Sequence, residues 1–391
     1  MVAYGFLSTF PPTRCALATH SLALAQQLHD PQRGERCGIV HVVDRLRPRP
    51  RQDPTVFLVK GHPSSAIRVI EALGRYDVAI VQHDFGIYGG PDGDEVLGVM
   101  EALDIPVIAV LHAVPAEAPE HRRLVLQRVI DAAAAVVVLS RADAATLHAH
   151  YRIDPDRLTV IPRGTTPAIP GQPGQRHSAP GVPTILTWGL IGPGKGIEHV
   201  VAALARLRDL EPTPRYLICG QQDPRVESWG SDAYRDLLLR TAREHGVEDL
   251  VTFDPAYRTP GALATLVRRA DVVVLPYVSR ERTTSAVLTE TLAARRPVVA
   301  SDFPHARELL GDGAGLIVAP RDPEALARAL RRVLTEPELA ASMQTKSGQV
   351  AALHPWHGVA AAFRDVAGTV LGQTRRPAPP TGDHAHLGRT T

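Results

Sequence analysis

The sequence predicts an α/β protein with two Rossmann-like domains, each a doubly wound parallel sheet, that face each other across a cleft. Short β-rich runs alternate with longer amphipathic segments, this alternation occurs twice, and a stretch rich in proline and glycine separates the two series. Such alternation is typical of parallel sheets covered by helices on both faces. The length of 391 residues also fits two domains, since one domain usually takes about 100 to 200 residues.

The first series predicts an N-terminal Rossmann-like domain over residues 1–165. Its β-rich runs are VAYGFLS, GIVHVV, VAIVQH, PVIAVLH, AAVVVLS and LTVIP, which begin at positions 2, 38, 78, 106, 134 and 158. Apolar residues at helical spacing lie between these runs, as in residues 15–28 and 120–132. We therefore expect each strand of this domain to lead into a helix.

Residues 166–183 hold so many prolines and glycines that no regular element fits, and we expect the interdomain linker there. The second series predicts a C-terminal Rossmann-like domain over residues 184–353. Its predicted strands begin at positions 184, 215, 251, 271, 297 and 315, and its predicted helices span 196–208, 231–245, 260–269, 285–295 and 323–335. A further helix is expected over 354–372, and the polar, proline-rich residues 373–391 are expected to be disordered.

Composition excludes several classes of function. Lysine and arginine number 43 against 41 acidic residues, which gives a formal charge of +2 and no basic stripe of the kind nucleic acid requires. No apolar run approaches the roughly 20 residues of a membrane span, and no signal segment opens the chain, so we expect a cytoplasmic protein. Cys15, Cys37 and Cys219 are too widely spaced for a metal cluster or a disulfide framework, and we expect reduced, buried thiols.

A glycine-rich turn follows the first strand of the second domain, in the sequence WGLIGPGKGIEHVVAAL from residue 188. Glycines such as Gly192, Gly194 and Gly196 let backbone amides approach a phosphate, the helix N-terminus adds partial positive charge, and Lys195 adds a full charge. The spacing is neither that of a Walker loop nor that of a dinucleotide fingerprint. The alternative is an ordinary strand-to-helix turn with a solvated lysine.

A second candidate anion site lies at the start of the helix predicted over 285–295. Thr284 or Ser285 can cap this helix, which leaves the amides of Ser285, Ala286 and Val287 free for an anion. Glu290 follows about one and a half turns later, near enough to accept hydrogen bonds from sugar hydroxyls. The alternative is a capped core helix with a solvated glutamate.

In the first domain, two strands end in histidine, in VQHDFGIYGG from residue 81 and VLHAVP from residue 110. His83 and His112 should share one sheet edge, and Asp84 with Gly89 and Gly90 lies beside the first of them. This grouping favours a polar cleft over two isolated structural histidines. No pair of aspartates after a strand and no histidine or cysteine cluster has the spacing of a metal site, so we expect no metal.

Together and in this order, these stretches resemble the family 4 retaining glycosyltransferases of GT-B fold, and specifically a bacterial subgroup of that family. The resemblance covers roughly residues 1–370. The motifs that carry it are FPPTRCALAT from residue 10, QHDFGIYGG from 82, LHAV from 111, IPRG from 161, GLIGPGKGIE from 189, YLICG from 216, LPYVSRERTTSAVL from 275 and DFPHARELL from 302. Each motif alone is weak, but eight in register strongly indicate the GT-B fold.

The resemblance implies a retaining transfer of a hexose, without metal or cofactor, from a GDP- or UDP-sugar held mainly by the second domain. Lys195 corresponds to the cation on the donor diphosphate, Glu290 to a glutamate that contacts the ribose, and His112 to a histidine that reaches the transferred sugar. The donor is a co-substrate, and the acceptor, held by the first domain, is an unidentified glycan, glycolipid or small molecule. Peripheral membrane contact and oligomeric state are left open. The helix with Trp356 corresponds to one that crosses back to the first domain.

The residues that these arguments and the resemblance single out fall into three groups. The candidate catalytic residues are His112, Lys195 and Glu290. The candidate donor-binding residues are Gly192, Gly194, Gly196, Arg282, Thr284, Ser285, Ala286 and Val287. The candidate acceptor-binding residues are Arg14, Thr19, His83, Asp84, Gly89 and Gly90.

Departures from the family pattern concern the positive charge around the donor. Arg282 stands where the family has the first glutamate of its Glu, seven residues, Glu motif, and Leu190 stands where it has an arginine beside Lys195. Within the subgroup, Ala16 replaces a glycine, Asp84 a glutamate and Arg163 a histidine. We hypothesise that Arg282, Arg280 or Arg163 supplies the missing charge.

Three other activities are compatible with the same fold, since fold alone does not determine the reaction. A sugar-nucleotide epimerase would turn over the nucleotide sugar without an acceptor, and a sugar phosphorylase would require phosphate. A catalytically degenerate protein would bind the nucleotide sugar without transferring it, and Arg282 and Leu190 keep that alternative open.

Overall fold

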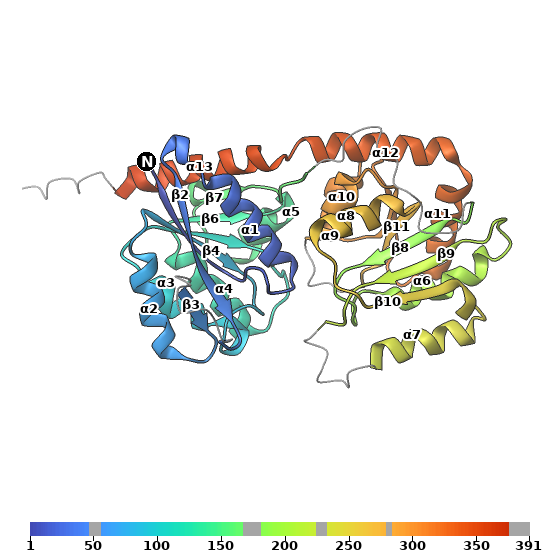
Figure 1. The fold of residues 1–391 in the computed structure, drawn as a ribbon, viewed down its shortest axis with the longest axis horizontal. Helices are drawn as coiled ribbons and strands as arrows, with labels where there is room; N and C mark the ends of the chain where they lie inside the picture. Colours follow the sequence, from blue (N-terminus) through green and yellow to red (C-terminus); the bar gives the residue numbers. More distant parts are fainter. Residues whose placement is uncertain (47–55, 167–180, 224–232, 279–283, 375–391) are drawn as a thin grey trace, which may run out of the picture.

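The computed structural model describes residues 1–46, 56–166, 181–223, 233–278 and 284–374, which form two α/β units in tandem (Figure 1). Each unit is built on one sheet, and every strand pair in both sheets is parallel. The predicted fold class is therefore confirmed: two Rossmann-like parallel sheets with helices on both faces.

The N-terminal sheet has the strand order β3-β2-β1-β4-β5-β6-β7. Its strands are β1 (Ala3–Ser8), β2 (Arg36–Val43), β3 (Val56–Val59), β4 (Val78–His83), β5 (Val107–Leu111), β6 (Ala135–Val138) and β7 (Leu158–Val160). The order reverses between β1 and β4, so the helices that follow these two parallel neighbours lie on opposite faces of the sheet. In sheets of this kind ligands bind outside the carboxyl ends of the strands at the reversal point.

Helices cover both faces of this sheet. The helices are α1 (Ala16–Leu28), α2 (Pro63–Leu73), α3 (Glu95–Glu101), α4 (Glu120–Ala132), α5 (Arg141–His150) and, from the far end of the chain, α13 (Trp356–Thr374). The apolar cluster on one face joins strand residues to α1 and α13, for example to Leu28 and Phe363. The cluster on the other face joins the strands to α2, α3, α4 and α5. The last helix of the chain thus completes the first domain.

The C-terminal sheet has the strand order β10-β9-β8-β11-β12-β13, with its reversal between β8 and β11. Its strands are β8 (Thr184–Trp188), β9 (Arg215–Cys219), β10 (Val251–Asp254), β11 (Val272–Leu275), β12 (Val298–Ser301) and β13 (Leu316–Val318). Its helices are α6 (Ile197–Leu204), α7 (Ala233–Glu244), α8 (Pro260–Arg269), α9 (Ala286–Ala293), α10 (Pro304–Leu310), α11 (Pro323–Thr335) and α12 (Pro337–Ala352). One apolar cluster packs α6, α7 and α11 on one face, and a second packs α8, α9 and α10 on the other.

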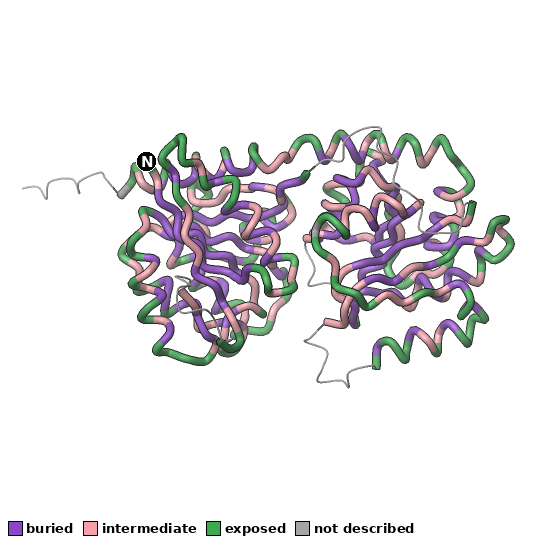
Figure 2. Tube along the Cα trace, viewed as in Figure 1, coloured by how far each residue is buried: buried purple, intermediate pink, exposed green. Residues whose placement is uncertain are grey.

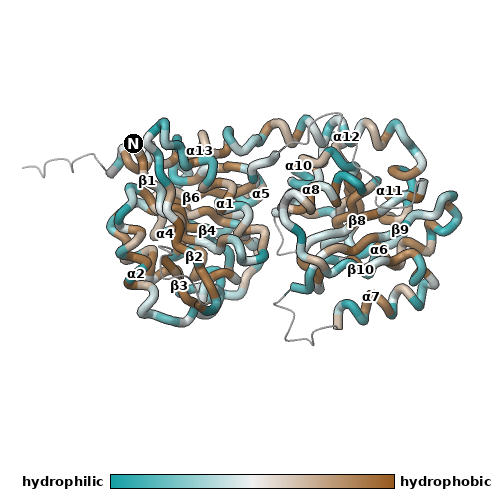
Figure 3. The backbone as a smooth tube through the Cα atoms, in the orientation of Figure 1, coloured by the Kyte–Doolittle hydropathy of each residue, from teal (hydrophilic) through white to brown (hydrophobic). Residues whose placement is uncertain are grey.

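Burial follows this layering. The strands at the centre of both units are buried, whereas the outward sides of the helices are exposed (Figure 2). The same strands are the most apolar parts of the chain, and polar residues gather on the outer helices and loops (Figure 3). Strands buried on both faces read as continuous apolar runs, which is why runs such as DVVVLP marked them in the sequence.

The chain crosses between the units twice, and the two crossings lie against each other. Thr165, in the outgoing crossing, forms a bridge with Pro355 in the returning one, and its Oγ1 donates to the carbonyls of Ala351 and His354 at 2.7 and 3.1 Å. Trp356 then packs over Gly164 so closely that a Cβ on Gly164 would lie 2.3 Å from the indole ring. These contacts hold Gly164 and Thr165 against the returning chain.

Most predicted elements match the structure. Helices α4, α8 and α11 have the predicted bounds, and the predicted helices over 15–28 and 285–295 begin one residue later, at Ala16 and Ala286. The last helix runs to Thr374, two residues into the segment expected to be disordered. Most of the predicted linker and of the predicted tail lies outside the described residues.

The structure also bears on the expectations about membrane spans and about the cysteines. No described helix is both long and apolar enough to cross a membrane. All three cysteines are free, as expected, but burial was overestimated because Cys15 and Cys37 are only half-buried and Cys219 alone is buried.

Gly164→Ala should destabilise the protein, because the new Cβ would collide with the rigid ring of Trp356 rather than with a flexible side chain. Overpacking of this kind typically costs about 1–3 kcal/mol, and urea unfolding would measure it as a lowered midpoint. Gly98→Ala is the matched control: Gly98 lies within α3, nothing stands within 4 Å of its Cβ position, and the change should leave the midpoint unchanged or raise it. A Gly164→Ala protein with the wild-type midpoint would contradict this account of the crossing.

Candidate functional site

Apart from His112, which follows β5, the residues singled out in the sequence lie at or after the strands at the reversal point of each sheet. The loops after β1 and β4 belong to the first unit, and the loops after β8 and β11 belong to the second. Groups of the two units meet, in part outside these loops: Thr284 Oγ1 donates to the carbonyl of His112, which follows β5, at 3.3 Å, and Nη2 of Arg163, which follows β7, lies 3.4 Å from Oε1 of Glu290 in α9. The candidate site therefore lies between the two units.

The glycine-rich turn after β8 is folded tightly against the end of β11. Gly194 and Gly196 have positive φ angles of 84° and 68°, and a Cβ on Gly196 would lie 1.9 Å from the Pro276 carbonyl oxygen. The Gly194 carbonyl accepts a hydrogen bond from the Val278 amide at 3.0 Å, and the Gly192 carbonyl accepts one from the Lys195 amide at 3.2 Å. Only glycine fits a left-handed conformation at such close approach, which explains the spacing of the turn.

This turn places the Lys195 ammonium inside the site. The Lys195 residue is only 7% exposed, and its Nζ lies 4.8 Å from the centre of the Tyr277 ring. A Cβ on Gly189 would lie 3.8 Å from Lys195 Nζ and 3.5 Å from Val287 Cγ2. The space above Gly189 therefore lies between the lysine and the first turn of α9. The alternative of a solvated Lys195 side chain is therefore wrong.

The start of α9 is held from three directions. Ser285 caps the helix, because its Oγ accepts from the Leu288 amide at 3.2 Å, and the same oxygen lies 3.2 Å from the Tyr277 hydroxyl. The Ser285 amide donates to His305 Nδ1 at 3.1 Å. The expectation that this amide is free was therefore wrong, since a histidine of α10 takes it. The next two amides, of Ala286 and Val287, have no acceptor among the described residues.

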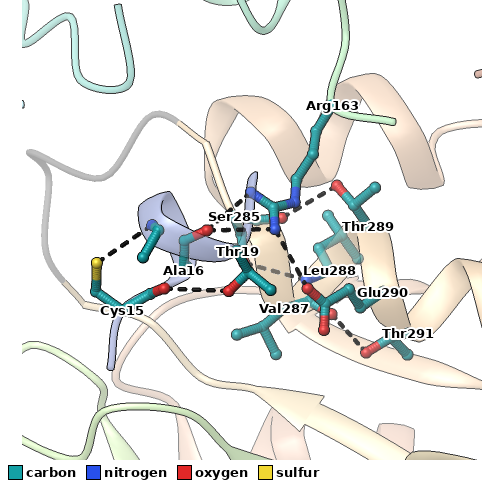
Figure 4. Close-up of polar contacts among 11 residues, drawn as sticks. Cys15, Ala16, Thr19, Arg163, Ser285, Val287, Leu288, Thr289, Glu290 and Thr291 are labelled. Carbon is teal, nitrogen blue, oxygen red and sulfur yellow. Dashed lines mark hydrogen bonds and ion pairs between the residues drawn. The ribbon is translucent and has the colours of Figure 1, made fainter. Parts of the chain in front are cut away.

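Glu290 forms an ion pair with Arg163 rather than standing alone in solvent (Figure 4). The Arg163 side chain is 9% exposed and that of Glu290 is 39% exposed. Burial raises the pKa of the Glu290 carboxyl, and the Arg163 charge acts against this rise. Of the three arginines proposed to replace a missing cation, Arg163 thus contacts Glu290, whereas Arg280 and Arg282 lie outside the described residues.

His112 is fixed by a residue that the sequence did not single out. Its Nε2 forms a hydrogen bond of 2.6 Å with Gln82 Oε1. Burial lowers the pKa of His112 to about 3, despite the opposing effect of Asp84. The ring is therefore neutral at neutral pH. The strand pattern marked Gln82 as part of β4, but nothing in the sequence showed that its side chain meets His112.

Two other histidines lie buried beside this pair. His20 of α1 packs edge-on against His112, with ring centres 5.1 Å apart, and against Trp356 at 5.4 Å. The side-chain nitrogens of His20 and His83 have no hydrogen-bond partner in the part of the chain that the structure describes. Burial lowers the pKa of both, to about 4 for His83. His83 is fully buried, so its ring lies beneath the surface of the site.

The remaining candidate acceptor residues occupy different places. Arg14 reaches the second unit, where its guanidinium lies 4.9 Å above the Tyr257 ring and its Nη1 lies 3.4 Å from Gln221 Oε1. Thr19 Oγ1 donates to the Cys15 carbonyl within α1, at 3.1 Å. Asp84 Oδ1 accepts from the Gly86 amide at 3.0 Å, which closes a local turn.

Gly89 and Gly90 form a turn that a single carboxylate secures. The Gly89 amide and the Gly61 amide both donate to the Glu95 carboxylate, at 3.0 and 3.2 Å, and Gly90 has a φ angle of 77°. A Cβ on Gly89 would lie 2.2 Å from Glu95 Oε2. The two glycines are thus required by the turn itself.

Leu190 introduces no charge beside Lys195, so the departure noted in the sequence stands. Among the described residues, no group of three or more His, Cys, Asp or Glu side chains could hold a metal ion.

The order of motifs and the fold agree with comparisons to known proteins. The family model described as glycosyl transferases group 1 matches residues 172–349, and that described as Glycosyltransferase Family 4 matches residues 18–168. Among curated relatives, the D-inositol 3-phosphate glycosyltransferase of Paenarthrobacter aurescens is 30% identical over 314 residues, which cover 74% of this chain and 70% of that protein. The enzyme of the same name from Corynebacterium glutamicum is 29% identical over 256 residues, which cover 62% and 59%. The chain spans 52 to 63% of the length of the first three curated relatives it matches.

Solved structures share the fold at low identity. Sucrose-phosphate synthase from Thermosynechococcus elongatus superimposes with a TM-score of 0.72 at 19% identity, over 95% of this chain and 100% of that one. Anabaena HepE, solved in complex with UDP-glucose, superimposes with a TM-score of 0.70 at 16% identity, over 94% and 100%. Both likenesses concern the fold of the two units together.

Stability should rise with pH between about pH 4 and 6.5, because three buried histidines stay neutral in the folded chain. Their pKa values fall from 6.5 to about 3 for His112 and to about 4 for His83 and His305. Below pH 6.5 the unfolded chain binds protons that the folded chain does not, so acid favours unfolding, and the effect levels off above pH 6.5. Chemical unfolding from pH 4.5 to 7.5 would measure this slope.

The variant His305→Gln should reduce the slope by about one proton, because the neutral amide can still accept from Ser285. The control His150→Gln, at an exposed position on α5, should leave the slope unchanged. A wild-type stability that does not vary over this range would contradict the neutral, buried state of these rings.

Proposed function

Because the chain belongs to the family 4, or group 1, glycosyltransferases, we propose that it is a retaining enzyme that moves a hexose from a nucleoside diphosphate sugar to an acceptor. The observation that carries this proposal is the start of α9. The Ala286 and Val287 amides have no acceptor among the described residues, and a Cβ on Gly189 would lie within 4 Å of both the Val287 side chain and the ammonium of the buried Lys195. Helix N-termini of this kind bind phosphate through backbone amides and the helix dipole. A diphosphate placed there would meet both amides and a full positive charge.

The proposed chemistry needs no metal ion. In the transfer, the bond from the sugar C1 to the diphosphate oxygen breaks while the bond from C1 to the acceptor oxygen forms. The leaving group gains negative charge, which the α9 amides and Lys195 would stabilise in a site largely closed to water. Preorganised donors of this kind supply the stabilisation that a divalent ion supplies in other transferases.

The acceptor proton must also be placed. His112, which the resemblance brings to the transferred sugar, has a pKa lowered to about 3 by burial, so at neutral pH its ring is a weak base. Its Nε2 is already hydrogen-bonded to Gln82. We propose that the leaving diphosphate oxygen takes the proton as the acceptor attacks the same face of the sugar. Retention of configuration then requires no protein nucleophile, and His112 orients the sugar.

The substrates are proposed from the relatives. HepE was solved with UDP-glucose, and another fold neighbour, from E. coli, with UDP-2-fluoro glucose, which favours a UDP-sugar over a GDP-sugar as the first donor to test. The curated relatives are named for inositol 3-phosphate, which makes a phosphorylated polyol the first acceptor to test. We propose that no further cofactor takes part and that the protein acts in the cytoplasm.

Thermal unfolding with a panel of nucleoside diphosphates should identify the donor. A ligand that binds only the folded chain raises its stability by about 2.7 kcal/mol at a hundred times its dissociation constant, so UDP or GDP should raise the melting temperature while the matching nucleoside should not. Equal effects of nucleoside and nucleoside diphosphate would contradict a diphosphate site. Binding followed by no transfer to any acceptor would identify a degenerate transferase.

Lys195→Ala should lower the rate of transfer by about 10² to 10³, because one preorganised charge on the leaving group is lost, and circular dichroism should show a folded protein. Lys346→Ala is the control in the same domain, on α12, and should transfer at the wild-type rate. A Lys195→Ala enzyme with near wild-type turnover would remove this lysine from the site.

A further inference from the structure

One arginine connects both domains at the candidate site. Arg163 follows β7 in the outgoing crossing, between Pro162 and Gly164, and its guanidinium extends toward α1 and α9 (Figure 4). Its Nη1 and Nη2 each lie 3.4 Å from the Ala16 carbonyl oxygen at the start of α1, and Nη2 lies 3.4 Å from Glu290 Oε1 on α9. The side chain is 9% exposed, so a full cation is buried where the two helices meet.

The pair between Arg163 and Glu290 is loose, and it leaves acceptor capacity on the carboxylate. All three contacts of the guanidinium are 3.4 Å long, whereas Arg364 Nε, in another buried pair, lies 2.9 and 3.1 Å from the two oxygens of Glu35. Glu290 Oε2 has no hydrogen-bond partner among the described residues, and the side chain is 39% exposed. A carboxylate only accepts hydrogen bonds. The groups that can bind Glu290 Oε2 are therefore hydrogen-bond donors, such as the hydroxyls of a sugar.

The charge of Glu290 depends on this arginine. Burial raises the pKa of Glu290, and the Arg163 charge together with its hydrogen bond lowers it. The other titratable groups near the pair are a thiol and four histidines: Cys15, His20, His112, His305 and His354. Burial lowers the pKa of all four histidines, so they are neutral at neutral pH. Within the described ranges, Arg163 is the cation that faces Glu290.

The position of Arg163 is set by the crossing and not by the site. On its C-terminal side Gly164 lies under the Trp356 ring, and Thr165 is hydrogen-bonded to the returning chain at Ala351 and His354. These contacts anchor the backbone at the point where the domains join. A side chain fixed there reaches the donor domain in a defined direction, as a positioning group must.

We propose that Arg163 is a positioning residue that holds the Glu290 carboxylate for the vicinal hydroxyls of the donor's ribose. Selection of a ribonucleotide by the second domain then depends on an arginine anchored in the first. This inference rests on the proposed function, because it requires a nucleoside diphosphate on the α9 amides. This role differs from direct binding of the diphosphate by Arg163. An arginine that contacts the phosphates would contribute equally to binding whether or not the ribose carries hydroxyls.

The test compares binding of a ribonucleoside diphosphate with binding of its 2′,3′-dideoxy analogue by calorimetry, using UDP and GDP with the wild type. Hydrogen bonds to a charged group are worth about 1.5–3 kcal/mol, so the wild type should bind the ribose form about 10- to 100-fold more tightly. This preference should vary little from pH 6 to 8, because the Arg163 charge acts against the rise in the pKa of Glu290.

In Arg163→Met the preference should depend on pH. Without the cation the pKa of the Glu290 carboxyl rises further, so the preference should be smaller at pH 6 than at pH 8. Arg163→Lys keeps the charge without the planar fork and should show a smaller loss, and it serves where the Met variant fails to fold. Glu290→Gln should show a weaker preference that does not vary with pH.

Arg364→Met is the matched control, because it breaks a buried arginine–glutamate pair between α13 and Glu35, and its ribose preference should equal that of the wild type. A wild-type preference in the Arg163 variants at every pH would overturn the proposal, and so would an equal loss for ribose and dideoxy forms, which would indicate a phosphate contact. A wild type that binds neither nucleotide would overturn the proposed function together with this inference.

Discussion

Two backbone amides in the first turn of α9, those of Ala286 and Val287, have no acceptor among the described residues, and the neighbouring contacts hold the helix start in place around them. The Ser285 hydroxyl oxygen accepts a hydrogen bond from the Leu288 amide, and His305, on the neighbouring helix, accepts one from the Ser285 amide. The second contact requires a neutral ring at His305, and burial keeps it neutral by lowering its pKa to about 4. An amide that is neither paired nor solvated is costly, and an anion is the ligand that best satisfies two of them at a helix N-terminus.

The two sheets bring groups of different kind to these amides. The reversal between β8 and β11 places the glycine turn with Lys195 beside the helix start, whereas the first domain contributes histidines that burial keeps neutral. Lys195 thus brings a buried positive charge to the second domain, where the proposed leaving diphosphate would develop negative charge. The first domain also sends two arginines across, Arg163 to Glu290 and Arg14 to Tyr257. The double crossing at Thr165 links the Arg163 contact to the relative position of the domains.

The loops that carry the candidate site residues could be predicted, because each follows a local sequence pattern. Glycine spacing, a serine before an apolar helix and an apolar run that ends in histidine each identified a loop at the correct edge of a sheet. The partners of those residues could not be predicted, because they are far apart in the sequence. Arg163 and Glu290 are 127 residues apart, Gln82 and His112 are 30 apart, and neither pair has a periodic signal. The acceptor that His305 provides for Ser285 was missed for the same reason, and the Ser285 amide was therefore wrongly expected to be free.

The most direct test of the central claim is a crystal structure of the protein with the nucleoside diphosphate that raises its melting temperature most. The account predicts phosphate oxygens within hydrogen-bond distance of the Ala286 and Val287 amides and of Lys195 Nζ. A nucleotide bound with its phosphates away from the first turn of α9, while that turn stays empty, would contradict it.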